Sequence, residues 1–143
     1  MTTLALDNSV VSDLVAGMNY PGEFLDTFPR DTNVVLPSIV WFEAMVPAFR
    51  SGDGRTVRET QSVLGNLPLL DFSREEANET AEIRAGLLDR GEPIGAPDVL
   101  IAGTARADGA AVVTNNAKDF NRVPDLEVHD LIDDRRAETG SDQ

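Results

Sequence analysis

Residues 4–15 of the sequence read LALDNSVVSDLV, and the prediction of the fold starts from this stretch. The apolar run at 4–6 ends at Asp7 and predicts a short buried strand. Asn8 and Ser9 then supply the polar groups that cap a helix. The apolar residues that follow fall on one face of that helix: Val10, Val11, Leu14 and Val15. A buried strand therefore leads directly into an amphipathic helix.

The same alternation of strand and helix continues along the chain. Ser73 and Glu76 form a capping box that predicts the start of the longest helix. We expect further strands at 34–36, 67–71, 110–114 and 126–128. We expect further helices at about 23–28, from 38 onward, at 55–66, from 74 to near 91, and after Asp98. Pro47 is expected to kink the helix that starts at 38.

This pattern predicts a single α/β domain. Short apolar strands that alternate with helices are typical of βαβ units and of a parallel sheet buried on both faces. We therefore expect a short parallel β-sheet flanked by helices on both faces, over residues 1–132. The polar residues 133–143 are expected to form a C-terminal tail.

The composition restricts the chemistry that the chain can perform. It contains no cysteine and one histidine, His129, so disulfides and thiolate metal sites are excluded and a histidine-based triad is disfavoured. Any catalysis must therefore come from carboxylates, hydroxyls, amides or arginines. The chain also lacks an apolar run of membrane-spanning length, so we expect a soluble, cytoplasmic protein with no membrane contact.

The net charge of −13 has two interpretations. There are 25 acidic residues against 12 Lys and Arg, and Lys118 is the only lysine. An acidic surface of this kind suits a protein kept soluble in very high salt, where the Debye length falls to about 3 Å and repulsion between carboxylates is screened. We expect a salt-adapted, halophilic source, and an ordinary acidic cytosolic protein is the alternative.

Four acidic residues fall where the predicted fold places the carboxyl ends of its strands. They are separated by long stretches of sequence, and only the fold can gather them: Asp7, Glu43, Asp98 and Asp119. Carboxylates brought together repel one another and need compensating cations, for which Mg²⁺ and Mn²⁺ are the natural choice. In the alternative reading these residues only cap helices or face solvent.

Two motifs in the C-terminal half carry a family resemblance. Residues 91–102, GEPIGAPDVLIA, and residues 113–120, VTNNAKDF, resemble the same regions of PIN-domain proteins, specifically the VapC-like toxins of toxin–antitoxin pairs. The resemblance extends to residues 6–9, LDNS, and to residues 38–43, SIVWFE, and it covers the chain from residue 4 to about 131.

The resemblance implies a PIN-like fold and an endoribonuclease that depends on Mg²⁺, with Mn²⁺ possible. It implies an RNA substrate, a cognate antitoxin and a homodimer. The family's four acidic positions fall on Asp7, Glu43, Asp98 and Asp119, and its supporting polar positions fall on Thr114 and Asn116. Asp7 and Asp98 are the expected direct metal ligands.

The sequence departs from the family pattern at three places. Asn8-Ser9 stands where the family has Thr-Asn or Thr-Ser, Ala44 stands where it has Leu, and Pro47 falls at an expected helical position. These departures bear on fine geometry. All four acids are present, which disfavours an inactive member.

Other residues have two interpretations each. Trp41, Phe42 and Phe49 either stack on bases or, as we expect, pack in the core or a dimer. For Arg84 and Arg90 the two interpretations are contact with RNA or an antitoxin, and pairing with nearby acids. We expect His129 to be structural or exposed. The first two helices, with residues 18–28, could provide an apolar groove for a partner.

Three alternatives to a toxin ribonuclease remain at this point. The first is a housekeeping PIN nuclease in RNA processing. The second is a non-catalytic binding protein with the same fold. The third is a phosphatase-like or deoxyribonuclease activity on the same metals, because metal-assisted phosphodiester cleavage is shared chemistry.

Overall fold

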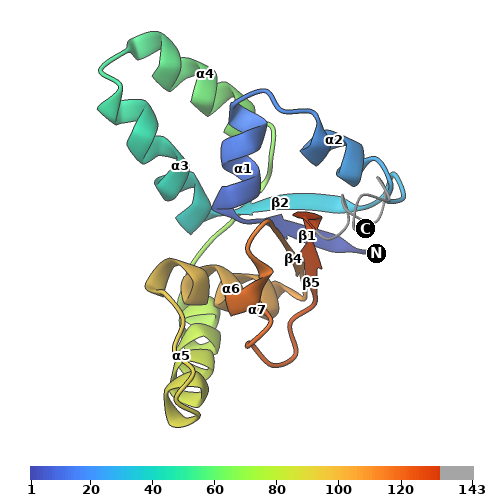
Figure 1. The fold of residues 1–143 in the computed structure, drawn as a ribbon, viewed down its shortest axis with the longest axis vertical. Coiled ribbons are helices and arrows are strands. Elements are labelled where there is room, and N and C mark those ends of the chain that lie inside the picture. The colour runs from blue at the N-terminus through green and yellow to red at the C-terminus, as the bar shows by residue number, and fades with distance from the viewer. Residues whose placement is uncertain (133–143) are drawn as a thin grey trace, which may run out of the picture.

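The computed structural model describes residues 1–132, and the predicted tail at 133–143 lies outside the described residues. Strands and helices alternate in the order that the sequence predicted (Figure 1). The elements are β1 (Thr3–Leu6), α1 (Asn8–Val15), α2 (Tyr20–Leu25), β2 (Asn33–Pro37), α3 (Ser38–Arg50), α4 (Gly54–Leu64), β3 (Leu69–Leu70), α5 (Arg74–Asp89), α6 (Ala96–Asp108), β4 (Ala111–Thr114), α7 (Ala117–Phe120) and β5 (Val128–Asp130).

The five strands form one parallel sheet in the order β3-β2-β1-β4-β5. Leu4 of the central strand β1 pairs with Val34 of β2 on one side and with Ala111 of β4 on the other. The chain first builds the sheet outward from β1 through β2 and β3, and then returns to add β4 and β5. The order reverses between β1 and β4, and in open α/β sheets a crevice for ligands lies outside the carboxyl ends of the strands at such a reversal.

Helices cover both faces of the sheet, as predicted. Figure 1 shows α1 to α4 on one side of the strands and α5 to α7 on the other. The central strands are buried on both faces, and Leu4, Leu6 and Val112 are each fully inaccessible to solvent. This explains why these strands read as continuous apolar runs and not as alternating ones.

The first helix begins one residue earlier than expected. Asp7, and not Asn8 or Ser9, is the N-cap of α1, and its side chain accepts a hydrogen bond from the backbone N–H of Val10. The expected capping role of Asn8 and Ser9 was therefore wrong. An aspartate at the end of β1 thus serves both the helix and the carboxyl edge of the sheet.

Several predicted boundaries shift by a few residues. The expected helix at 23–28 is α2, which begins at Tyr20, and the strand expected at 126–128 is β5, at Val128–Asp130. The strand expected at 67–71 is reduced to Leu69–Leu70, and the short helix α7 was not predicted. The helix α3 continues through Pro47 to Arg50 as one element. The capping box of Ser73 and Glu76 is present at the start of α5.

Close packing of α5 on α6 depends on Gly103. A Cβ atom added there would lie 1.8 Å from Oγ1 of Thr80 and 2.8 Å from its Cα. This contact brings the two helices together on the lower face of the sheet. No helix in the described part of the chain is long and apolar enough to cross a membrane.

Candidate active site

Asp7 lies at the carboxyl end of the central strand and is almost completely buried, with 4% of its surface exposed. Its backbone N–H donates to the carbonyl of Val113 across the β1–β4 pair, at 3.1 Å. Its carboxylate Oδ1 accepts from the hydroxyl of Ser9 at 2.6 Å and from the N–H of Val10 at 3.2 Å. Its Oδ2 accepts from the hydroxyl of Thr114 at 2.5 Å. Both carboxylate oxygens are therefore held in fixed directions.

The two hydroxyls that hold Asp7 are themselves held by the backbone that follows β4. The N–H of Asn115 donates to Oγ of Ser9 at 3.0 Å, and the N–H of Asn116 donates to Oγ1 of Thr114 at 2.9 Å. Each hydroxyl accepts one hydrogen bond and donates its own to the carboxylate. Two successive amides are thus connected, through two hydroxyls, to the two oxygens of Asp7.

A cavity of about 230 Å³ opens beside Asp7 at this edge of the sheet. Three of the four predicted acids contribute to its wall: Asp7 from the end of β1, Glu43 from α3 and Asp98 from the first turn of α6. The remaining wall is formed by Asn8, Ser9, Ile101 and Asn116. The reversal in strand order therefore gathers acids that are far apart in the sequence.

Burial disfavours the ionised forms of three acids of the cavity, and neighbouring carboxylates add to this effect at Glu43 and Asp98. Burial raises the pKa of Asp7 above its ordinary value, against the opposing effect of its hydrogen-bond donors. Burial, and then the charges of Asp98 and Asp7, raise the pKa of Glu43. The pKa of Asp98 is raised to about 6, first by burial, then by the charges of Asp119 and Asp7, and by a hydrogen bond with Asp119. Such mutual repulsion is typical of a site built to receive a cation.

One carboxylate oxygen in the site has no protein partner. Oε1 of Glu43 is buried and forms no hydrogen bond among the described residues. A buried oxygen without a donor is costly unless another group supplies the missing interaction. The chemistry of the donor set fits a hard divalent cation, which binds oxygen ligands.

The site is open and does not enclose an ion by protein groups alone. Within residues 1–132, no three His, Asp or Glu side chains stand close enough together to form a ready set of ligands around one ion. Mg²⁺ is usually bound in proteins by one or two carboxylates and keeps several waters. The loose spacing of the acids is therefore compatible with Mg²⁺ held partly through water.

The other predicted site residues lie around this cavity in different ways. Asp119, in α7, is close to Asp98, as its effect on the pKa of Asp98 indicates, but it does not line the cavity. Thr114 is fully buried and faces Asp7. Asn116 lines the cavity, and its backbone N–H holds Thr114.

Two polar residues were not selected from the sequence as site residues. Ser9 entered the sequence analysis as an expected helix cap and as a departure from the family pattern, although in the structure it donates directly to Asp7. Asn115 holds Ser9 through its backbone N–H. The position of Ser9 two residues after an N-cap aspartate was a usable signal, because short polar side chains there readily bond to the cap.

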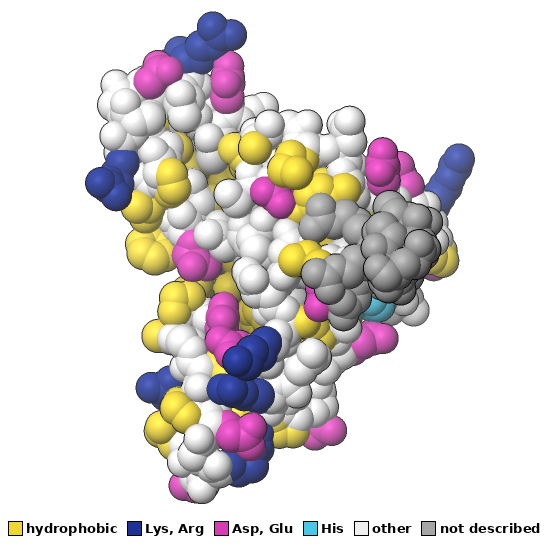
Figure 2. All heavy atoms as spheres, in the orientation of Figure 1, with side chains coloured by type: hydrophobic (Ala, Val, Ile, Leu, Met, Phe, Trp, Pro, Cys, Tyr) yellow, Lys and Arg dark blue, Asp and Glu magenta, His cyan; other side chains and the backbone are white. Residues whose placement is uncertain are grey.

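Arg84 of α5 and Arg90, the C-cap of that helix, both bind backbone carbonyls of nearby loops. Arg84 donates to the carbonyl of Ile94 at 3.0 Å, and Arg90 donates to the carbonyl of Arg122 at 2.8 Å. Arg90 also pairs with Glu92, which agrees with the alternative that these arginines pair with nearby acids. Together they fix the segment that leads into Asp98. Figure 2 shows Lys and Arg side chains gathered near α5 and α7, among carboxylates that are dispersed over this face.

His129 belongs to an aromatic cluster. Its ring lies 5.9 Å from the ring of Phe24 and 5.5 Å from that of Phe28. The expectation of a structural role agrees with this packing. Phe24 of α2 and Phe28, in the loop after it, therefore pack against the core of the protein.

The aromatic residues of α3 are mostly exposed. Phe42 is 65% exposed and Phe49 is 63% exposed, so of the two expected roles, packing in the core or in a dimer, the core is excluded for both residues. They lie with Val46 beside a shallow apolar cavity of about 430 Å³ that also contacts Trp41. An exposed apolar face of this kind is typical of an interaction surface.

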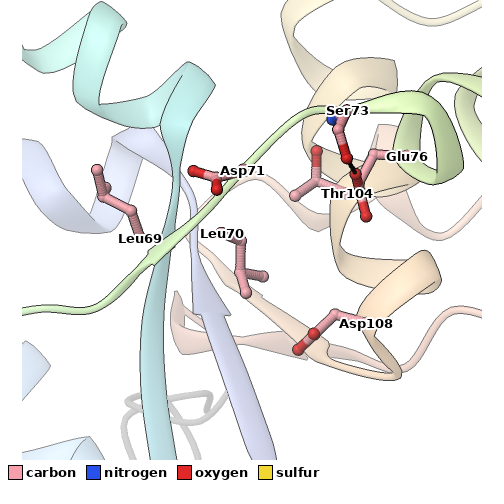
Figure 3. Close-up of a pocket in the computed structure, with 7 residues that line it drawn as sticks. All are labelled: Leu69, Leu70, Asp71, Ser73, Glu76, Thr104 and Asp108. Atoms are coloured by element: carbon pink, nitrogen blue, oxygen red, sulfur yellow. Dashed lines mark hydrogen bonds between the residues drawn. The ribbon is translucent and has the colours of Figure 1, made fainter.

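A second acidic pocket has a different character. Figure 3 shows Asp71, Glu76 and Asp108 around a cavity between β3 and the helices α5 and α6. Glu76 accepts hydrogen bonds from the hydroxyl and backbone N–H of Ser73, and these bonds lower its pKa. That glutamate therefore caps a helix, whereas the acids beside Asp7 lack sufficient donors.

Comparison with known proteins agrees with this description. Residues 4–126 match the PIN domain family. The tRNA(fMet)-specific endonuclease VapC of Salmonella typhimurium strain LT2 is 32% identical over 114 residues, which are 78% of this chain and 86% of that protein. Among solved structures, DNA-bound VapBC from Salmonella typhimurium has a TM-score of 0.81 at 28% identity, covering 92% of this chain and 99% of that one. VapBC2 from Rickettsia felis, bound to a DNA fragment from their promoter, has a TM-score of 0.78 at 27% identity, covering 90% and 98%.

A five-stranded parallel sheet with carboxylates gathered at its carboxyl edge is the architecture of a PIN-type nuclease. The chain belongs to the PIN-domain family, and within it to the VapC ribonucleases, the RNA-cleaving toxins of type II toxin–antitoxin pairs. The family resemblance found in the sequence is therefore confirmed.

Proposed function

We propose that Asp7, Glu43, Asp98 and Asp119 are the catalytic residues of this ribonuclease, and that they bind Mg²⁺, or alternatively Mn²⁺. The observation that carries the proposal is the cavity beside Asp7, where three carboxylates meet and where burial and neighbouring negative charges raise the pKa values of Glu43 and Asp98. A cation placed there would remove the repulsion and would supply the missing partner of Glu43.

Asp7 and Asp98 are the proposed direct ligands. Oδ1 of Asp7 accepts two hydrogen bonds and Oδ2 accepts one, so Oδ2 keeps an acceptor site for a cation. Asp98 has a pKa of about 6 in the protein without metal, and it would release its remaining proton when a cation binds. Glu43 and Asp119 would complete the cluster directly or through water.

When bound, the divalent ion supplies a Lewis acid and a water of lowered pKa for attack on the RNA phosphodiester. The protein residues orient this chemistry. Ser9 and Thr114 fix the carboxylate of Asp7, and Asn116 offers an amide at the cavity wall. Glu43, with one unpartnered oxygen, is placed to accept a proton or a hydrogen bond from a water in the cavity.

Transfer RNA is the proposed substrate class, and a cognate antitoxin is the proposed partner. The relative from Salmonella typhimurium is named as a tRNA(fMet)-specific endonuclease, and the similar solved structures are VapBC complexes. The protein carries a formal charge of −13, so the phosphates of an RNA would need both the bound cation and local arginines to approach. The Lys and Arg side chains near α5 and α7 are suited to this role.

A homodimer formed through α3 is also proposed. Phe42, Val46 and Phe49 follow a helical spacing and are all substantially exposed. A contiguous apolar stripe exposed on a protein surface commonly marks an interaction site, because covering it removes apolar area from water. A second copy of the same stripe would do so with two-fold symmetry.

The test is cleavage of total cellular RNA by the purified protein, with Mg²⁺, with Mn²⁺ and with EDTA, in low and in high salt. We expect cleavage that requires the metal and that is lost in Asp98→Asn. Asp26→Asn, which removes an exposed carboxylate outside the site, is the matched control and should cleave like the wild type. A folded, partner-free protein that cuts no RNA under any of these conditions would favour the non-catalytic alternative.

A further inference from the structure

A second set of polar side chains lies outside the cavity and is connected to Asp7 through Ser9. Nδ2 of Asn115 donates to the hydroxyl of Tyr20 at 2.5 Å, and that hydroxyl donates to Oδ2 of Asp13. Nδ2 of Asn115 also lies 3.4 Å from the same oxygen of Asp13. All three contacts are partly buried. We call Asp13, Tyr20 and Asn115 the clamp.

The clamp joins three segments that the sequence separates widely. Asp13 belongs to α1, Tyr20 is the first residue of α2, and Asn115 follows β4. Oδ1 of Asn115 is buried and has no hydrogen-bond partner among residues 1–132. The side-chain amide of Asn115 is therefore held through its nitrogen, by Tyr20 and Asp13.

The backbone that the clamp holds is the same backbone that holds Asp7. The N–H of Asn115 donates to Ser9, whose hydroxyl donates to Oδ1 of Asp7. The next N–H, of Asn116, donates to Thr114, whose hydroxyl donates to Oδ2 of Asp7. A displacement of the segment 115–116 would change the directions of both hydroxyls and, with them, the orientation of the carboxylate.

We propose that the clamp positions the carboxylate of Asp7 for a divalent cation, and that Tyr20 is its central residue. This inference rests on the proposed metal-binding role of Asp7. None of the three clamp residues lines the cavity, so we assign them a positioning role and not direct contact with the cation. Groups that orient a metal ligand from behind commonly change metal affinity by roughly 10- to 100-fold when they are removed.

The first experiment measures Mn²⁺ affinity by isothermal titration calorimetry, without RNA. Tyr20→Phe removes the hydroxyl and keeps the ring, and we expect Mn²⁺ to bind roughly tenfold more weakly. Thr27→Ala is the matched control, because it removes one hydroxyl hydrogen bond in the turn after α2 that has no connection to Asp7. It should bind Mn²⁺ like the wild type. Equal affinity in Tyr20→Phe and the wild type would overturn the proposal.

A double-mutant cycle separates positioning from a general structural effect. Ser9→Ala cuts one connection between the clamp and Asp7. If the clamp acts through that connection, adding Tyr20→Phe to Ser9→Ala weakens Mn²⁺ binding by a smaller factor than Tyr20→Phe does alone. Multiplicative effects would show that Tyr20 acts elsewhere and would refute the proposed route.

Asp13 provides a second pair of variants if Tyr20→Phe does not fold. Asp13→Asn keeps an oxygen that accepts from Tyr20 and should retain Mn²⁺ binding close to that of the wild type, whereas Asp13→Ala should lose roughly tenfold. The same affinity for both variants would contradict the clamp. If the wild type itself does not bind Mn²⁺, the proposed function fails, which is a different outcome from a clamp without effect.

Discussion

Replacement of Asp98 by asparagine should stabilise the protein in the absence of metal. Asp98 is partly buried beside Asp119 and Asp7, and its pKa is raised from 3.8 to about 6. At about 1.4 kcal/mol per pKa unit this difference corresponds to about 3 kcal/mol of destabilisation at neutral pH. Because the side chain retains contact with solvent, screening reduces the expected gain on substitution to roughly 1–2 kcal/mol.

The sign and the pH range of this effect follow from proton binding. A carboxyl with a raised pKa binds more protons in the folded than in the unfolded protein between about pH 4 and pH 6. The stability of the wild type should therefore fall as the pH rises through this range. Asp98→Asn lacks this contribution, so the difference between the two proteins should be largest above pH 6 and should vanish near pH 4.

The assay is thermal unfolding in EDTA at several pH values. For a chain of this length, roughly 1–2 kcal/mol should raise Tm by about 3–6 °C at pH 7.5. Addition of Mg²⁺ should reverse the order, because the wild type gains binding energy that Asp98→Asn has lost. Asp26→Asn is the control for the loss of one negative charge. If Asp98→Asn is no more stable than this control at pH 7.5 in EDTA, the carboxylates do not repel one another as the structure indicates.

Three further predictions concern packing, assembly and salt. Gly103→Ala should lower the free energy of unfolding by about 1–3 kcal/mol in urea titrations, because its Cβ would overlap Thr80. An unchanged midpoint of urea unfolding would mean that α5 and α6 can move apart to accept the added methyl group. Phe42→Glu with Phe49→Glu should convert a dimer into a monomer in light scattering, and a wild type that is already monomeric would exclude the α3 interface. The unfolding temperature should rise from about 0.1 M to about 1 M KCl as the charge of −13 is screened, whereas a flat response would argue against salt adaptation.

The sequence determined the order and type of most elements by local patterning. Short apolar runs such as 4–6 are typical of buried strands when they alternate with amphipathic stretches that form helices. The same runs predicted a parallel sheet with helices on both faces, and that prediction is confirmed. The boundaries were less certain, because β3 and β5 are short edge strands whose limits depend on a single neighbour.

The motifs of the sequence also selected four acids as candidate site residues, and the structure places three of them around one cavity. Their spacing in the chain contained no information on distance or charge. The raised pKa values of Glu43 and Asp98 arise from burial and from neighbours contributed by other elements. Electrostatic effects of this kind require the three-dimensional arrangement.

Only the tertiary structure decided which side chains support Asp7. Thr114 is 107 positions away from Asp7, and Asn115 is 106 positions away from Ser9, yet each pair forms a hydrogen bond. It also decided that Phe42 faces solvent, since helical spacing identifies an apolar stripe but does not say what covers it. Hydrogen bonds and burial depend on distances of a few ångströms between distant segments, and such distances are fixed only when strands pair and helices pack.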